Sequence, residues 1–217
     1  MRSLRTATAG LLAVLALAGC AQDRPASDGP VANVSVHDDD GLNGVVLPKP
    51  YDLPDLTLEN TSSKPFDVGT DLTKPLTLVF FGYTNCPDIC QVVMADIASA
   101  LTRLEPHQRG KVAMVFITTD PARDDVRTLR GYLHRFDPSF SGLTGDLTEI
   151  VALGRAVDVH IEKGDKLPSG GYDVGHGTQI VGVLPDGTAP FVWTQGTDPA
   201  SLAEDITKIL NDKVPGL

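Results

Sequence analysis

Two cysteines, Cys86 and Cys90, are the residues of this sequence whose types and spacing most directly indicate chemistry. They follow an apolar run at residues 76–81 and stand at the start of a helical pattern that begins near Ile89. Side chains four positions apart on a helix share one face, with Cβ atoms about 5–6 Å apart. That separation suits one shared soft metal ion, and it also suits an internal disulfide. Because the amide groups at a helix start stabilise thiolates, the sequence predicts a reactive pair that can chelate or oxidise.

The elements that must position these thiols follow an α/β pattern. Residues 76–81 and 112–117 are continuous apolar runs, typical of strands buried on both faces of a sheet. The helix that starts with the cysteines joins these two strands as a parallel crossover. A second helix is expected to begin at Pro121, with Asp120 as its cap. Residues 178–184 and 189–193, separated by a Pro-Asp-Gly turn, predict a hairpin.

Shorter elements complete the expected order. They are an edge strand at 53–59, a return strand around Phe66 and Val68, a brief strand or turn near Leu143, a helix from Asp146 or Thr148, a loop at 162–172, and a last helix that Pro199 opens. This order predicts a thioredoxin-like α/β fold, in which helices flank a central mixed sheet that ends in a C-terminal hairpin and helix.

The amino terminus indicates export. Arg2 and Arg5 precede an apolar run at 11–17, and Leu-Ala-Gly-Cys ends at Cys20, so residues 1–19 resemble a bacterial lipoprotein signal peptide. That resemblance implies cleavage before Cys20 and attachment of lipid to its sulfur; an ordinary secretory cut that leaves Cys20 free is the alternative. Residues 20–50 are rich in Asp, Gly, Pro and Ser, which predicts a flexible tether, and residues 51–217 form the expected domain.

The charge of the chain bears on its partners and its compartment. The formal net charge is −10, and loss of Arg2 and Arg5 with the signal lowers it to −12. Such a chain repels nucleic acid and anionic headgroups, so membrane association is expected to come from the lipid alone. Export places the domain on the extracytoplasmic face of the cell membrane. Dithiols there become disulfides unless a metal or a reductant keeps them open.

Several motifs in the same order resemble the Sco/SenC family of thioredoxin-like copper proteins. They are Phe80-Phe81-Gly82-Tyr83-Thr84-Asn85-Cys86-Pro87-Asp88-Ile89-Cys90, Thr119-Asp120-Pro121-Ala122-Arg123-Asp124, Asp173-Val174-Gly175-His176 and Pro185-Asp186-Gly187. The resemblance runs from about Leu53 to the C-terminal helix. It implies a copper ion bound by Cys86, Cys90 and His176, and service to the binuclear copper site of cytochrome c oxidase. An upstream extracytoplasmic copper donor is then also expected.

The sequence departs from the family pattern near the expected ligands. Gln91 stands where the family commonly has Pro, Asn85 where it often has His, and Gly175 where it tends to have Asp. The last change removes an acidic neighbour that could orient His176. Taken alone, His176 is as typical of a surface or core histidine as of a ligand. His107 and His134 are expected to be structural, and His160 is a distant second candidate.

Asp120 and Asp124 lie at the carboxyl end of the strand beside the cysteine strand, the edge where open α/β sheets place their sites. The family resemblance implies that they support the metal ligands or contact a partner. Helix capping together with an ion pair to Arg123 is the structural alternative, and both interpretations stay open.

Two functions compete for the thiols. Two thiolates and an imidazole form a soft set that favours Cu(I), and its low coordination number suits a copper carrier. The alternative is a thiol-disulfide oxidoreductase that reduces the cysteines of the oxidase copper site, with Cys86 attacking and Cys90 resolving. A thiol peroxidase needs a single cysteine at a peroxide pocket, which the paired motif argues against.

Overall fold

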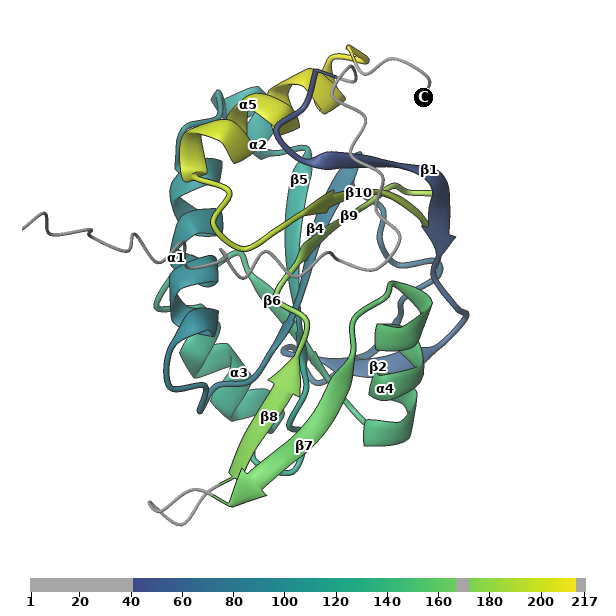
Figure 1. Cartoon of the computed structure of the whole chain (residues 1–217), viewed down its shortest axis with the longest axis vertical. Coiled ribbons are helices and arrows are strands. Elements are labelled where there is room, and N and C mark those ends of the chain that lie inside the picture. The colour runs from purple at the N-terminus through teal and green to yellow at the C-terminus, as the bar shows by residue number, and fades with distance from the viewer. Residues whose placement is uncertain (1–40, 167–171, 214–217) are drawn as a thin grey trace, which may run out of the picture. The chain divides into compact units, whose positions relative to one another are not determined.

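The computed structural model describes residues 41–166 and 172–213, and its centre is a mixed sheet (Figure 1). Eight strands form this sheet in the order β1-β10-β9-β4-β5-β6-β2-β3. Their bounds are β1 Val45–Asp52, β2 Thr57–Asn60, β3 Pro65–Asp67, β4 Leu76–Gly82, β5 Val112–Thr118, β6 Ser141–Thr144, β9 Ile180–Val183 and β10 Thr188–Trp193. A separate two-stranded ribbon consists of β7 Ile161–Lys166 and β8 Tyr172–His176.

Five helices are present in the described part of the chain. They are α1 Ile89–Thr102, α2 Pro106–Arg109, α3 Val126–Leu133, α4 Leu147–Ala156 and α5 Pro199–Leu210. In Figure 1, α1 and α3 lie on one side of the sheet and α4 lies on the other. None of the helices within 41–166 and 172–213 combines the length and apolar character that a membrane crossing requires.

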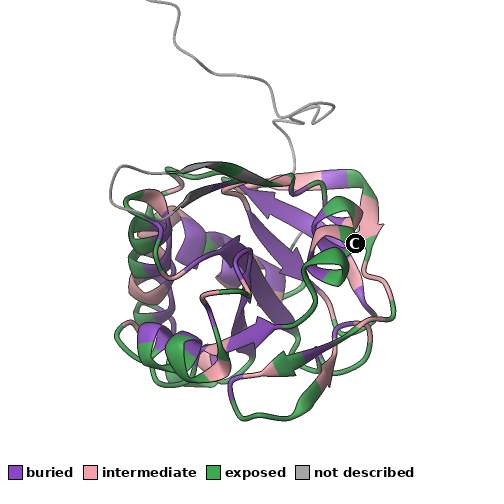
Figure 2. Ribbon diagram, turned by 90° about the horizontal axis from the view of Figure 1, so that it is seen from below, coloured by how far each residue is buried: buried purple, intermediate pink, exposed green. Residues whose placement is uncertain are grey.

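The sheet separates two cores because strand side chains alternate between its faces. Along β4, Leu78 and Phe80 join the core that includes α1, α3 and α5, whereas Val79 and Phe81 join the core that includes α4. All seven residues of β4 are buried, and Figure 2 shows the buried strands enclosed by helices whose outer faces are exposed. The strand that leads to the cysteines is therefore covered on both faces.

The main elements agree with the predictions from the sequence. β4 pairs with β5 in parallel and with β9 antiparallel, so the sheet is mixed as expected. α1 begins at Ile89 and α5 at Pro199, and β9 and β10 form the predicted hairpin. The thioredoxin-like fold class is confirmed.

The boundary between tether and domain was predicted too late. Residues 20–50 were expected to be a tether, yet β1 begins at Val45 and pairs antiparallel with β10. Pro48 and Pro50 obscure this strand in the sequence, but an edge strand tolerates residues that cannot donate to the ladder. The predicted signal peptide and Cys20 lie outside the described residues.

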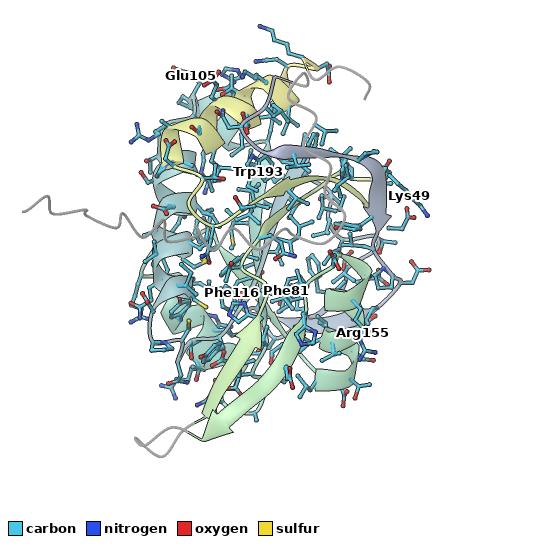
Figure 3. The ribbon with its side chains drawn as sticks, viewed as in Figure 1. Lys49, Phe81, Glu105, Phe116, Arg155 and Trp193 are labelled. Carbon is cyan, nitrogen blue, oxygen red and sulfur yellow. The ribbon has the colours of Figure 1, made fainter. Side chains whose placement is uncertain are left out.

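A buried carboxylate holds the start of the described chain against the last helix. Asp205 on α5 accepts hydrogen bonds from the backbone amides of Asn43 (2.9 Å) and Gly44 (2.8 Å). Trp193, labelled in Figure 3, donates from Nε1 to Asp205 Oδ2 at 2.8 Å. The fit is close, because a Cβ on Gly44 would lie 2.4 Å from Trp193 Nε1. Asp205 therefore joins the N-terminal segment, β10 and α5.

The second predicted helix begins five residues later than expected. α3 starts at Val126, and its cap is Asp125, whose side chain accepts from the Thr128 amide at 2.7 Å. The preceding residues make a single turn in which the amides of Arg123 and Asp124 donate to the Asp120 carbonyl. The prediction that Asp120 caps the helix was wrong, because its buried side chain forms an ion pair with Arg123 instead.

The loop predicted at residues 162–172 is wrong for residues 162–166 and 172, which belong to the ribbon of β7 and β8; residues 167–171 lie outside the described part of the chain. In this ribbon Ile161 pairs with His176. Gly, Lys and Asp in β7 give no apolar alternation, so the sequence pattern carried no strand signal there. The ribbon matters for function because His176 is the last residue of β8.

Candidate metal centre

The cysteine motif lies where β4 ends and α1 begins. The Cys86 amide donates to the Tyr83 carbonyl at 3.2 Å, which closes a turn after the strand. Asp88 occupies the cap position of α1, but its side chain makes no cap hydrogen bond. The Cys90 amide instead donates to Cys86 Sγ at 3.5 Å. The first sulfur therefore accepts one of the helix-start amides that normally need a side-chain oxygen.

His176 approaches the cysteines from the ribbon. Its Nδ1 lies 2.8 Å from the Gly177 carbonyl oxygen. A carbonyl only accepts, so Nδ1 carries the proton and Nε2 keeps its lone pair. Nε2 lies 3.3 Å from Cys90 Sγ. The ring is held edge-on by Phe80 and Tyr83, with ring centroids at 6.1 and 6.0 Å.

The ligand atoms of Cys86, Cys90 and His176 all lie within 4.8 Å of one another. Within 41–166 and 172–213, no other trio of His, Cys, Asp or Glu side chains gathers in this way. An ion with bonds of about 2.3 Å in a trigonal arrangement holds its ligand atoms about 4 Å apart. Both cysteines are free thiols and buried, whereas His176 is half-buried. The three side chains can thus close on one ion with small movements.

The two thiols differ in acidity. Hydrogen bonding from the Cys90 thiol is the main cause that lowers the pKa of Cys86, and the hydrogen bond from the Cys90 backbone amide adds to it. The same hydrogen bond to Cys86, followed by burial, raises the pKa of Cys90. Whether both thiols are reactive therefore stays a prediction for the pair as a whole. Metal binding must displace the proton that the two sulfurs share.

Asp124 fixes the loop that carries the cysteines. Its buried carboxylate accepts from the Thr84 amide at 2.9 Å, the Thr84 hydroxyl at 2.5 Å and the Thr118 hydroxyl at 2.7 Å. Burial is the main cause that raises the pKa of Asp124. Asp124 thus links Thr84, in the loop that leads to the cysteines, to Thr118 at the end of β5. It is not one of the three candidate ligands.

Asp120 reaches the site through other side chains. It pairs with Arg123, whose guanidinium lies 5.7 Å from the centroid of the Tyr83 ring. Tyr83 in turn contacts the His176 ring. Asp120 therefore helps to position an aromatic wall of the site, and it too lies outside the trio.

The other histidines considered from the sequence are not brought to the cysteines. His107 on α2 and His134 after α3 are exposed. His160 is also exposed, and its Nε2 lies 3.3 Å from Glu162. Sequence reasoning missed Gly82, the last residue of β4. A Cβ there would lie 3.0 Å from the Phe116 ring and 3.1 Å from Cys90 Sγ, and a glycine directly before a cysteine motif is the signal that could have indicated this tight contact.

Comparisons with known proteins agree with this geometry. The chain is 32% identical over 149 residues to a candidate copper-binding protein of Stutzerimonas stutzeri, covering 69% of this chain and 72% of that protein. It covers 47% of the mitochondrial SCO2 homolog of Danio rerio, with 35% identity over 130 residues, so it spans about half of that relative.

Solved structures with copper bound share the fold. ScoI of Arabidopsis thaliana with copper bound has a TM-score of 0.66 and 27% identity, covering 76% of this chain and 98% of that one. ScoI of Bradyrhizobium japonicum with copper bound has a TM-score of 0.63 and 29% identity, covering 75% and 99%. The SCO1/SenC family model matches residues 53–211, which include the cysteine motif, the ribbon and all but the first strand of the sheet. The chain therefore belongs to the SCO1/SenC family.

Proposed function

We propose that this protein binds one copper ion through Cys86 Sγ, Cys90 Sγ and His176 Nε2, and delivers it to the binuclear copper site of cytochrome c oxidase. The observation that carries the proposal is the convergence of these three atoms within 4.8 Å. Thiolates and imidazole are soft or borderline ligands that select Cu(I) over hard ions. The relatives with bound copper support the choice of metal.

The arrangement suits a carrier better than a permanent store. Three ligands leave copper a coordination position that an incoming thiolate of an acceptor can take. His176 is half-buried and belongs to a ribbon that is separate from the main sheet. It is therefore the ligand best placed to leave first while the two sulfurs still hold the ion. BsSco has a similar fold and is described as a member of the Sco family of cytochrome c oxidase assembly proteins. This description supports the choice of acceptor.

Replacing His176 by alanine tests the proposal. Loss of one of three ligands is expected to weaken Cu(I) binding roughly 100-fold or more, since even outer partners of metal ligands contribute 10–100-fold. The affinity is measured by competition with a chromophoric chelator. His160→Ala is the matched control, because His160 is exposed, directly precedes β7 and is not one of the three candidate ligands.

Transfer is then followed by mixing the copper-loaded protein with the metal-free soluble fragment of the oxidase copper subunit. Copper is expected to move to the fragment. Equal Cu(I) affinity in wild type and His176→Ala would contradict the ligand set, and copper retained by the carrier would contradict delivery.

A second function rests on the contact between two free thiols, in which the Cys90 amide donates to Cys86 Sγ. Cys86 has a lowered pKa and Cys90 a raised one, which is the division between an attacking thiolate and a resolving thiol. In this reaction Cys86 attacks a partner disulfide and releases one partner thiolate. Cys90 then loses its proton and displaces the second, which leaves a Cys86–Cys90 disulfide and a partner dithiol. His176→Ala retains this activity if the protein acts as a reductase, so the same variant separates the two functions.

We further propose that a lipid on Cys20 anchors the protein to the extracytoplasmic face of the cell membrane, where an upstream donor loads it with copper. The lipobox-like Leu17-Ala18-Gly19-Cys20 supports this placement. Copper handling on that side of the membrane also explains how two thiols stay reduced in an oxidising compartment, because a bound metal protects them.

A further inference from the structure

Two buried side-chain oxygens in the described part of the chain have no hydrogen-bond partner: the hydroxyls of Thr77 and Tyr132. Tyr132 is 3% exposed, so bulk water does not reach its hydroxyl. A buried donor without an acceptor destabilises the folded protein, and such a group in a native structure usually has another role. The two hydroxyls differ in one respect, which is their position relative to the cysteines.

Tyr132 packs in the same core as Cys90, against the ring of Phe116. It faces inward from α3, and its ring packs against Phe116 with centroids 5.6 Å apart. The ring of Phe116, which is labelled in Figure 3, and Cys90 Sγ both lie beside Gly82. A Cβ on Gly82 would lie 3.0 Å from the Phe116 ring and 3.1 Å from Cys90 Sγ. Cys86, Cys90, Phe116 and Tyr132 all belong to one core.

Electrostatics support this proximity. Burial raises the pKa of Tyr132, and the negative charges of Cys90 and Cys86 raise it further. The two sulfurs influence the phenol more strongly than does Arg135, whose guanidinium lies 4.9 Å from the centroid of its ring. The hydroxyl therefore keeps its proton at neutral pH and remains a hydrogen-bond donor.

We propose that Tyr132 is a positioning residue of the metal centre, whose hydroxyl donates a hydrogen bond to Cys90 Sγ when the pair binds copper as thiolates. A thiol is a weak acceptor, whereas a thiolate accepts a short, charge-assisted hydrogen bond. The donor that lacks a partner in the metal-free protein gains one in the loaded protein. The proton stays on the phenol oxygen, and no covalent bond changes. This inference rests on the proposed copper binding.

Such a hydrogen bond affects the copper ion through the sulfur. It withdraws negative charge from the thiolate, so it favours Cu(I) over Cu(II) and raises the energy of the sulfur-to-Cu(II) charge transfer. Without the hydroxyl, the sulfur donates more charge, and the charge-transfer band moves to longer wavelength. The loss of one charge-assisted hydrogen bond weakens Cu(I) binding roughly tenfold.

The test compares Tyr132→Phe with Thr77→Val in the full chain. Each variant removes one unpartnered buried hydroxyl at nearly constant volume. Thr77 lies near the start of β4, and its neighbours Leu76 and Leu78 face the cysteine core, so Thr77 points to the other face of the sheet. Thr77→Val therefore controls for the general effect of removing such a group.

Both metal-free variants are expected to melt at or above the temperature of the wild type, because each loses an unsatisfied polar group. Only Tyr132→Phe is expected to bind Cu(I) about tenfold more weakly and to show a longer-wavelength Cu(II) charge-transfer band.

Unchanged affinity and spectrum in Tyr132→Phe would overturn the inference, as would the same spectral shift in Thr77→Val. A lower melting temperature for metal-free Tyr132→Phe would also overturn it, because the hydroxyl would then have a partner without copper. A wild-type chain that binds no copper would instead refute the proposed function itself.

Discussion

Replacing Asp124 tests how the cysteine loop is held in place. The carboxylate accepts three hydrogen bonds, two from Thr84 and one from Thr118, and it is fully buried. Asp124→Ala removes all three acceptor contacts and leaves the Thr84 amide without a partner. At about 1 kcal/mol for each hydrogen bond and about 1–3 kcal/mol for a stranded buried donor, the free energy of unfolding is expected to fall by about 3–5 kcal/mol.

Asp124→Asn is the matched variant. The amide oxygen can accept from the Thr84 amide and the Thr118 hydroxyl, and the NH₂ group can donate to the Thr84 hydroxyl oxygen. We therefore expect Asp124→Asn to retain most of the stability that Asp124→Ala loses. Urea unfolding curves of the three proteins measure the difference, and amide hydrogen exchange at Thr84 reports whether the loop itself opens.

The pH dependence gives a further check with a definite sign. Burial raises the pKa of Asp124 in the folded protein, so the folded state binds this proton more tightly than the unfolded state. The resulting stabilisation is fully present below the unfolded pKa of about 3.9 and is lost as pH rises through the higher folded pKa. Asp124→Asn does not titrate, so its stability relative to wild type is expected to increase over that interval. Equal urea midpoints for wild type and Asp124→Ala, or a relative stability of Asp124→Asn that decreases with pH, would refute this account.

Three other changes probe separate features. Gly82→Ala adds a methyl group against Cys90 Sγ and is expected to cost about 1–2 kcal/mol of unfolding free energy and to weaken copper binding; an unchanged affinity would show that the contact is dispensable. Asp205→Ala leaves the buried Trp193 Nε1 without an acceptor and is expected to cost about 3 kcal/mol, which thermal unfolding followed by tryptophan fluorescence measures; a loss below about 1 kcal/mol would contradict the role given to this carboxylate. Cys20→Ser is expected to release the protein from membranes in cell fractionation, and full retention would exclude the lipid anchor.

The parts of the fold that the sequence predicted well are those with strong local signals. Residues 76–81 and 112–117 are uninterrupted apolar runs, and both became central strands. Pro199 begins α5 after Asp198, which caps the helix in the way that its position suggests. The cysteine pair was placed correctly because a strand, a turn and a helix follow one another within a few residues.

The errors arose where long-range contacts outweigh local preference. Pro121 after Asp120 has the pattern of a helix start. The Asp120 side chain instead forms an ion pair with Arg123, and the helix begins only after Asp125, which caps it. The short helix α2, which Pro106 opens and in which Glu105 and Gln108 form a capping box, was not predicted. After Ile161, β7 has no apolar alternation, so nothing in its sequence indicated the ribbon.

The candidate site was only partly predictable for the same reason. The spacing of Cys86 and Cys90 is local, so their shared role followed from the sequence. His176 lies 86 residues beyond Cys90, and its approach depends on a ribbon that local signals do not predict. Tyr132 is an ordinary inward-facing helix residue in the sequence, and only its missing hydrogen-bond partner and its neighbours distinguish it.

The attachment of Asn43 and Gly44 to Asp205 has a mechanical consequence. Tension that enters the domain through Gly41 is transmitted by these hydrogen bonds to α5 and, through Trp193, to β10. None of the segments that carry the three candidate ligands takes part in this load path. A pull on the segment before Gly41 therefore acts first on α5 and β10. It reaches the elements that carry the cysteines only through the packing of α5 on α1 and the pairing of β10 with β9 and of β9 with β4.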